Sequence, residues 1–176
     1  MNKLTLSDFN FLLSETPIKP RLKNELRFVT STENMSDEEW NDRELLSITD
    51  RNGNKGVLLI SIDDNLYILP YEFKAGITSL STGRSQSIIC DFCQTWQYGN
   101  KAGSISFSKD RVSSISYLCC GDLKCSMHVR NKTSAAHTSR AQLREDLSIE
   151  QRIERLNSRM KIIVSGLPLE PVHLSM

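Results

Sequence analysis

This chain of 176 residues has no long apolar run, almost no net charge and only three histidines. No stretch approaches the roughly 20 consecutive apolar residues that a membrane-spanning helix needs. The first residues contain no apolar run long enough for a signal peptide. The net charge is only +1, so no global field draws the chain towards nucleic acid or a membrane surface. These absences predict a cytoplasmic protein without a membrane partner.

The common motifs of catalytic sites are missing as well. The sequence contains no G-x-S-x-G, H-E-x-x-H, P-loop or G-x-G-x-x-G pattern. We interpret each of its three histidines as a surface residue rather than a general base; they are His128, His137 and His173. The sequence therefore predicts a protein that is not an enzyme and has no small-molecule substrate. An enzyme with an unrecognised pocket is the alternative.

The pattern of the sequence divides the chain into three parts. Residues 1–45 predict a helical and irregular N-terminal extension, whose first helix has Ser7 as its N-cap and ends at Thr16, before a proline. Residues 46–166 predict one domain, and residues 167–176 a tail. The hydrophobic fraction of 39% is ordinary for a folded protein.

Two kinds of periodicity predict an α+β fold. Residues 46–73 predict a three-stranded antiparallel meander with turns at 52–53 and 63–65, because Asn-Gly supplies the backbone angles of a tight hairpin. Apolar residues alternate with serine around 105–107 and 115–117, which predicts a second hairpin. Residues 122–131 predict a short helix.

The last predicted element is an amphipathic C-terminal helix. Its apolar residues recur at spacings of four and three, which places them on one face; they are Ile149, Ile153, Leu156, Met160 and Ile163. Ser148 and Gln151 have the spacing of a capping box, and Gly166 follows the last periodic residue. We interpret this helix as packing on its own domain.

Five cysteines carry the strongest chemical signal. Cys90 and Cys93 form a C-x-x-C pair, and Cys119, Cys120 and Cys125 follow 26 or more residues later. In a reducing compartment, cysteines serve as metal ligands, catalytic thiols or buried apolar residues. An odd number also fits disulfide pairing poorly. Two separated pairs can surround one zinc ion, which takes four sulfurs at about 2.3 Å.

The second pair requires a choice between Cys119 and Cys120 as the partner of Cys125. Strand parity places Cys119 on the same face as Ile115 and Tyr117, so Cys119 continues an apolar stripe. Cys120 then points the other way, just before a glycine that allows a sharp turn. The predicted metal ligands are Cys90, Cys93, Cys120 and Cys125.

A site with four cysteines is closed, whereas catalytic zinc keeps one position for water. We therefore predict one structural zinc ion. His128, three residues after Cys125, is a further candidate ligand, although four cysteines already fill the site. The alternatives are a redox-active C-x-x-C and buried free thiols.

The residues around the cysteines resemble a known family. Cys90-x-x-Cys93 followed by CGDLKCSMHVR at 120–130 is similar to the C-terminal treble-clef zinc finger of elongation factor G-binding proteins of the FusB/FBP type. The second knuckle of that family reads C-A-D-L-x-C-S-x-x-x-R. The similarity covers roughly residues 35–165, because the family also has an upstream β-meander and a final helix. It implies a β-meander with a four-cysteine treble clef, in which Cys120 is the third ligand; Cys119 is an addition to the pattern.

The resemblance also implies a partner. Members of the family bind elongation factor G on the ribosome, and the resistance members release a factor trapped by fusidic acid. Those members carry a separate N-terminal helical bundle, for which residues 1–45 are too short and too polar. We therefore predict a zinc-binding protein-interaction module that binds elongation factor G, on the ribosome, and modulates translation or factor release.

Three basic residues flank the second knuckle and are predicted to contact the partner: Lys124, Arg130 and Lys132. A solvated helix face is the alternative interpretation of this charge. The alternative function is an RNA- or ribosome-binding zinc protein without specificity for elongation factor G, whose binding would weaken steeply with salt. Few aromatic residues are available there for base stacking, only Trp96, Tyr98 and Phe107.

Overall fold

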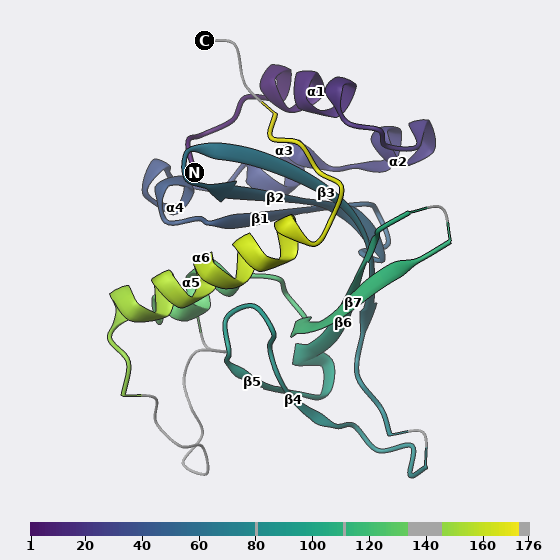
Figure 1. Cartoon of the computed structure of the whole chain (residues 1–176), viewed down its shortest axis with the longest axis vertical. Helices are drawn as coiled ribbons and strands as arrows, with labels where there is room; N and C mark the ends of the chain where they lie inside the picture. The colour runs from purple at the N-terminus through teal and green to yellow at the C-terminus, as the bar shows by residue number, and fades with distance from the viewer. Residues whose placement is uncertain (80, 111, 134–145, 173–176) are drawn as a thin grey trace.

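The computed structural model describes residues 1–79, 81–110, 112–133 and 146–172 (Figure 1). They contain a five-stranded antiparallel sheet of order β1-β2-β3-β6-β7 and a separate two-stranded sheet, β4-β5. The strands are β1 (Leu45–Thr49), β2 (Lys55–Ile62), β3 (Asn65–Ala75), β4 (Ser87–Ile89), β5 (Trp96–Tyr98), β6 (Ala102–Ser108) and β7 (Ser114–Cys120). The predicted α+β class, the meander and the second hairpin are all present, and β3 pairs with β6 to join the two hairpins in one sheet.

The helices are short except for the first and the last. They are α1 (Leu6–Glu15), α2 (Pro20–Glu25), α3 (Phe28–Thr32), α4 (Asp37–Asn41), α5 (Cys125–Val129) and α6 (Ile149–Ser165), with a 3-10 turn, η1, at Gly99–Lys101. Figure 1 shows α1 to α3 on one side of β1, β2 and β3, and α6 on the other. No helix among the described residues combines the length and apolar character needed to cross a bilayer.

The two predicted turns of the meander are both present, but only the second is a tight two-residue hairpin. Ile62 pairs with Asn65, so β2 and β3 are joined by only Asp63 and Asp64. Both aspartates have positive φ, 48° and 63°, as a type I′ turn requires. Gly53 supplies the positive φ, 71°, in the preceding turn.

The first helix begins earlier than predicted. Thr5, not Ser7, is the N-cap: its hydroxyl accepts a hydrogen bond from the backbone N–H of Asp8 at 3.1 Å. The Asp8 carboxylate in turn accepts the backbone N–H of Thr5 at 2.8 Å. This reciprocal pair satisfies two N–H groups of the first turn, and Asn10, three residues after Ser7, carries no carboxylate. The predicted end at Thr16 is confirmed.

The N-terminal helices cover one face of the meander. Their buried aromatic residues are Phe9, Phe28 and Trp40, and the rings of Phe9 and Phe28 stack at 4.5 Å between centroids. These residues share a core with Val57 and Leu59 of β2. Residues 1–45 are therefore packed against the sheet, although the domain boundary at residue 45 stays a prediction.

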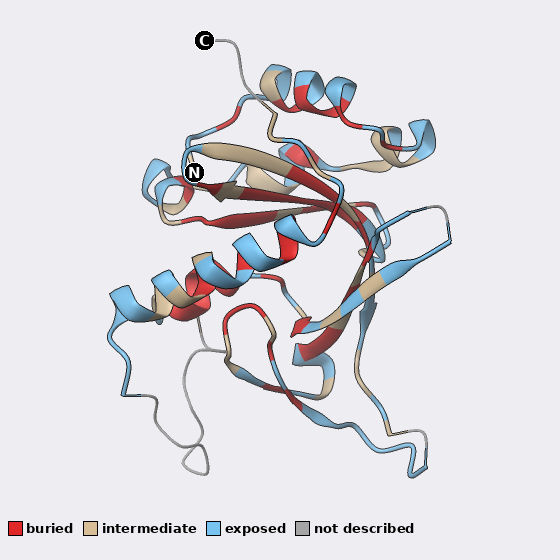
Figure 2. Ribbon diagram, viewed as in Figure 1, coloured by how far each residue is buried: buried red, intermediate tan, exposed pale blue. Residues whose placement is uncertain are grey.

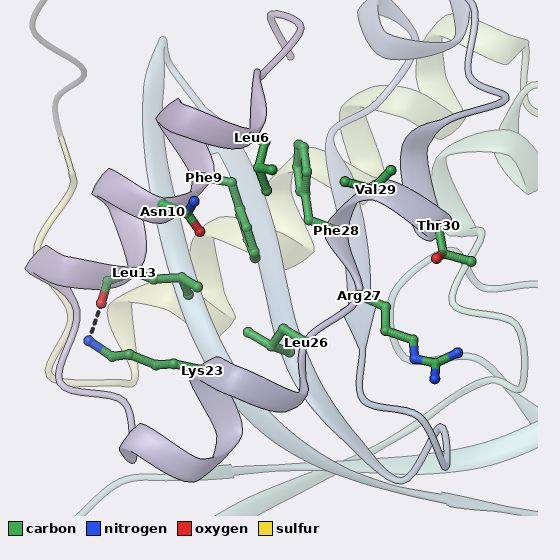
Figure 3. A pocket seen from close by; sticks show the side chains of 10 residues that line it. All are labelled: Leu6, Phe9, Asn10, Leu13, Lys23, Leu26, Arg27, Phe28, Val29 and Thr30. Atoms are coloured by element: carbon green, nitrogen blue, oxygen red, sulfur yellow. Dashed lines mark hydrogen bonds between the residues drawn. The ribbon is translucent and has the colours of Figure 1, made fainter.

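The same helices enclose a small cleft of about 170 Å³, shown in Figure 3. Phe9 and Leu13 of α1 face Leu26 and Phe28 across it (Figure 3). The Lys23 ammonium donates a hydrogen bond to the Leu13 carbonyl in the last turn of α1, where unpaired carbonyls favour a cation.

The other face of the meander packs on α6 and on the cysteine-rich region. Along β2, Leu58 and Ile60 enter this second core, whereas Val57 and Leu59 enter the first. Because side chains alternate along a strand, one run of apolar residues packs into the cores on both faces of the sheet. Figure 2 shows the resulting buried band through the middle of the sheet.

Helix α6 has the predicted capping box, in which Ser148 accepts the N–H of Gln151 at 3.3 Å. Its buried residues are Leu156, Met160, Ile163 and Val164. The predicted stripe is wrong at its first position, because Ile149 is 38% exposed. The first turn of α6 therefore extends beyond the core that buries the later turns.

Candidate metal centre

The first pair of cysteines lies in a tight turn between β4 and β5. The Cys90 N–H donates to the Thr95 carbonyl at 2.9 Å, and the Gln94 N–H donates to the Cys90 carbonyl at 2.9 Å. Gln94 has a positive φ of 58°, which lets the chain reverse within the turn. Cys90 and Cys93 are thereby presented towards the same point, as a zinc knuckle requires.

The knuckle is held against β7 by a reciprocal pair of hydrogen bonds. The Asp91 N–H donates to the Leu118 carbonyl at 2.8 Å, and the Leu118 N–H donates to the Asp91 carboxylate at 2.7 Å. These bonds fix the knuckle beside the end of β7, where the second pair of cysteines begins.

The second pair spans the turn from β7 to α5. Cys120 is the last residue of β7, and Cys125 is the first residue of α5. Gly121 lies between them, with its N–H donating to the Lys101 carbonyl at 2.7 Å. A Cβ at Gly121 would lie 2.5 Å from the Asn100 carbonyl oxygen, so the close approach of the two backbones requires glycine here.

The four sulfur atoms of Cys90, Cys93, Cys120 and Cys125 lie within 4.8 Å of one another. The Cys93 and Cys120 sulfurs are 3.4 Å apart, and the Cys90 and Cys125 sulfurs are 3.7 Å apart. A tetrahedron with zinc–sulfur bonds of about 2.3 Å has sulfur–sulfur edges of about 3.8 Å. All four cysteines are at most 1% exposed. The donor set and its spacing therefore fit one zinc ion.

The electrostatics of the cluster favour a cation at its centre. Hydrogen bonds from Cys120, Cys125 and Cys90 hold the pKa of the Cys93 thiol well below its usual value. Hydrogen bonding to Cys120 and its other neighbours raises the pKa of the Cys125 thiol instead. One thiolate is thus stabilised at the expense of the next, because buried like charges repel. Four thiolates can share this space only around a metal ion. Because four cysteines complete the tetrahedral coordination of zinc, the site is a structural one without an open position.

Cys119 has a different environment from the four sulfurs that converge. It is fully buried in the apolar cluster with Ile105 and Phe107. Burial raises the pKa of its thiol, so this sulfur stays protonated and packs as an apolar group.

His128 corrects an expectation from the sequence. It is fully buried rather than a surface residue. Its Nδ1 lies 3.2 Å from the Cys120 sulfur, and its Nε2 lies 3.2 Å from the Asp122 carboxylate. Burial alone would lower the pKa of this imidazole, but the hydrogen bonds to Asp122 and Cys93 raise it to about 9. The histidine therefore orients a ligand and donates to its sulfur, a supporting role common around metal sites. His137 and His173 lie outside the described residues.

The buried hydroxyl of Ser126 makes a structural contact that the sequence did not indicate. It accepts hydrogen bonds from the backbone N–H groups of Glu44, at 3.0 Å, and Leu45, at 3.2 Å. These contacts join α5 to the start of β1 across 82 and 81 positions of sequence. The zinc finger is thereby anchored on the sheet.

The three basic residues predicted to contact a partner have different surroundings. Arg130 makes a two-pronged ion pair with Glu44, at 2.9 and 2.5 Å. Lys132 contacts Glu38 at 2.9 Å and Asp42 at 2.5 Å. Lys124 is exposed. Two of these charges therefore attach the finger to the chain itself, and contact of all three with a partner stays a prediction.

A buried centre of four cysteines, built from a knuckle hairpin and the first turn of a helix, defines a treble-clef zinc-finger protein. The chain belongs to the FBP C-terminal treble-clef zinc-finger family, whose pattern it matches over residues 21–167. This match begins further upstream than the similarity seen around the cysteines and takes in the meander and α6. No curated protein and no solved structure gives a match to this chain.

Proposed function

We propose that this protein is a zinc-stabilised module that binds elongation factor G, on the ribosome in the cytoplasm, and modulates translation or release of the factor. Membership of the FBP family carries the proposal, together with the resemblance of residues 120–130 to the elongation factor G-binding proteins. The role is binding rather than catalysis, because the four cysteines occupy every position of a tetrahedral zinc ion.

An exposed apolar surface on the knuckle hairpin supports a protein partner. Ile89 of β4 pairs with Trp96 of β5, and Tyr98 lies two residues further along the same strand. Their side chains therefore share one face of the two-stranded sheet. Ile89 is 58% exposed, Trp96 43% and Tyr98 52%. We call these three residues the knuckle face and propose it as the contact with the factor, because Trp and Tyr are enriched among the residues that dominate binding energy.

The test is a binding assay between the purified chain and purified elongation factor G, with and without fusidic acid. We expect Trp96→Ala to weaken binding about tenfold or more, as loss of a central aromatic contact does. Ile162→Ala is the matched control, because Ile162 is an exposed apolar residue, 62% exposed, on α6. Both variants should retain zinc. Absence of binding by the wild-type chain, or equal binding by Trp96→Ala, would contradict the proposal.

One observation favours RNA as the alternative partner. The rings of Trp96 and Tyr98 are exposed and nearly parallel, with centroids 6.1 Å apart and planes 8° apart. Such a pair can stack on unpaired bases. RNA binding would weaken steeply with rising salt, since phosphate contacts release counterions. Binding of a single-stranded oligonucleotide with that salt dependence, and no binding of the factor, would favour this alternative.

A further inference from the structure

Arg43 is a buried cation that no described residue neutralises directly. It is only 8% exposed, and its Nε is buried without a hydrogen-bond partner among the described residues. Within the same residues its guanidinium forms no ion pair. An arginine held in this way incurs the cost of losing its water without the compensation of a carboxylate.

The acidic residues around Arg43 are engaged elsewhere. Asp42 contacts Lys132 at 2.5 Å, and Glu44 binds both terminal nitrogens of Arg130. Glu39 accepts the backbone N–H of Ser36 in the capping box of α4. These three carboxylates lie near enough to influence Arg43 electrostatically, yet none supplies it with a hydrogen bond. The terminal nitrogens of Arg43 also have no hydrogen-bond partner among the described residues, so they are the donors that can serve another acceptor.

Arg43 lines a cleft of about 280 Å³ between α3, α4, β1 and the turn that precedes α5. Lys124 contributes a second cation, and Thr30, Ser31 and Asn34 contribute hydroxyl and amide groups. Two carboxylates, those of Glu39 and Asp122, also line the cleft. Glu39 accepts the Ser36 N–H at 3.1 Å. The two oxygens of Asp122 accept from His128 at 3.2 Å and from the Lys124 N–H at 3.1 Å.

We propose that this cleft binds one phosphate group, either as inorganic phosphate or as part of a small phosphomonoester. The planar guanidinium of Arg43 matches the geometry of a phosphate through two parallel hydrogen bonds. Arg43 and Lys124 supply the positive charge for the group, while the Glu39 and Asp122 carboxylates accept hydrogen bonds from the chain itself. This proposal is independent of the binding of elongation factor G.

The surroundings of the cleft favour a small ligand over a polyanion. Its volume of about 280 Å³ is just below the range for small-molecule sites, about 300 to 1,000 Å³. Helix α4 beside it carries Asp37, Glu38 and Glu39 in its first turn. An RNA backbone, which carries a charge at every nucleotide, would bring more negative charge against these carboxylates than a single phosphate does.

The experiment measures thermal unfolding and calorimetric binding of the zinc-loaded full chain, with potassium phosphate titrated against potassium chloride at equal ionic strength. Phosphate should stabilise the wild-type protein in a saturable manner, because a ligand that binds the native state shifts the unfolding equilibrium. Arg43→Met keeps the length of the side chain and removes its charge. We expect it to weaken phosphate binding about tenfold or more, with no loss of stability in chloride.

Arg51→Gln is the matched control, because Arg51 is an exposed arginine in the turn after β1, and it should respond to phosphate as the wild type does. Lys124→Gln, a change at an exposed residue, should weaken phosphate binding and decides the question if Arg43→Met does not fold. Glycerol phosphate and inorganic phosphate, compared on the wild type, distinguish an ester from the free ion. The proposal would be overturned if Arg43→Met responded to phosphate as the wild type does. If Arg43→Met is unfolded, the same result in Lys124→Gln would overturn it. A wild type that responds to phosphate no more than to chloride would also overturn it.

Discussion

Replacing Cys120 by serine should remove the zinc and with it the fold of the finger, whereas replacing Cys119 should do neither. Cys120 is fully buried and its sulfur lies 3.4 Å from that of Cys93. Serine presents a neutral hydroxyl in place of a thiolate, and it leaves the remaining three cysteines with an incomplete tetrahedron. The nearby Nδ1 of His128, 3.2 Å from the lost sulfur, also loses its partner.

The expected magnitudes of the two substitutions differ strongly. Structural zinc contributes on the order of 10–16 kcal/mol in finger peptides, so an average one of four ligands accounts for about 2.5–4 kcal/mol. That loss is a large part of the free energy of unfolding of a typical domain, about 5–15 kcal/mol. Cys119→Ser instead places a hydroxyl in an apolar cluster, at a cost of about 1–3 kcal/mol, with the metal retained.

The assay combines zinc content by elemental analysis with urea unfolding of the untagged protein, before and after treatment with a strong chelator. Wild type and Cys119→Ser should each hold one zinc ion and lose cooperative unfolding when it is chelated. Cys120→Ser should hold less than one and resemble the chelated wild type. Wild-type protein that is cooperative yet free of zinc would refute the reasoning, and so would zinc retained in Cys120→Ser but lost in Cys119→Ser.

Two further predictions concern the packing around the metal centre and the sheet. Gly121→Ala should destabilise the protein by about 1–3 kcal/mol and weaken zinc retention, because the new Cβ would lie 2.5 Å from the Asn100 carbonyl oxygen. Gly166→Ala is the control, because its Cβ would have no neighbour closer than 3.5 Å. It should change the free energy of unfolding in urea by less than about 0.5 kcal/mol. Tyr71→Phe should cost about 1 kcal/mol at neutral pH, since the Tyr71 hydroxyl is 2.6 Å from that of Ser47. Burial raises the pKa of Tyr71 to about 12, above the value near 10 of an unfolded tyrosine, so the wild type loses up to about 2.7 kcal/mol between pH 10 and 12 that the variant keeps. The order of stability should therefore reverse between about pH 10.5 and 11, where the loss in the wild type passes about 1 kcal/mol, and parallel pH profiles of the two proteins would contradict this.

The features that the sequence predicted are those determined by neighbouring residues. The turn at Asp63 and Asp64, the capping box at Ser148 and the opposite directions of Cys119 and Cys120 each depend on a few consecutive positions. Strand parity needed only the alternation along β7 to separate a packed thiol from one that faces the metal. The error at Ser7 is also local: the Asp8 carboxylate completes a capping box for Thr5, two positions before the predicted N-cap.

The features that the sequence missed depend on contacts between distant segments. Nothing near Ser126 indicates that its hydroxyl accepts N–H groups from Glu44 and Leu45, because those residues lie more than 80 positions away. The burial of His128 follows from the packing of α5 beneath the rest of the fold, and periodicity in a helix of five residues cannot reveal it. The three-residue spacing from Cys125 was the available signal, since it places both side chains on one side of a helix.

The same long-range contacts couple the zinc finger to the N-terminal helices. Arg130 leaves the end of α5 and binds Glu44 at the start of the sheet, while Lys132 binds Asp42 just after α4. The side chain of Arg130 is 13% exposed and that of Glu44 is 10% exposed. Removal of Arg130 would leave the largely buried Glu44 carboxylate without its ion pair, at a cost of about 3–5 kcal/mol, whereas removal of Glu44 leaves Arg130 its contact with Asp42 at 3.4 Å. Loss of the zinc should likewise weaken the pairing of Arg130 with Glu44, because α5 begins at a metal ligand. We therefore expect the metal to stabilise the contact between α5 and the start of the sheet as well as the finger itself.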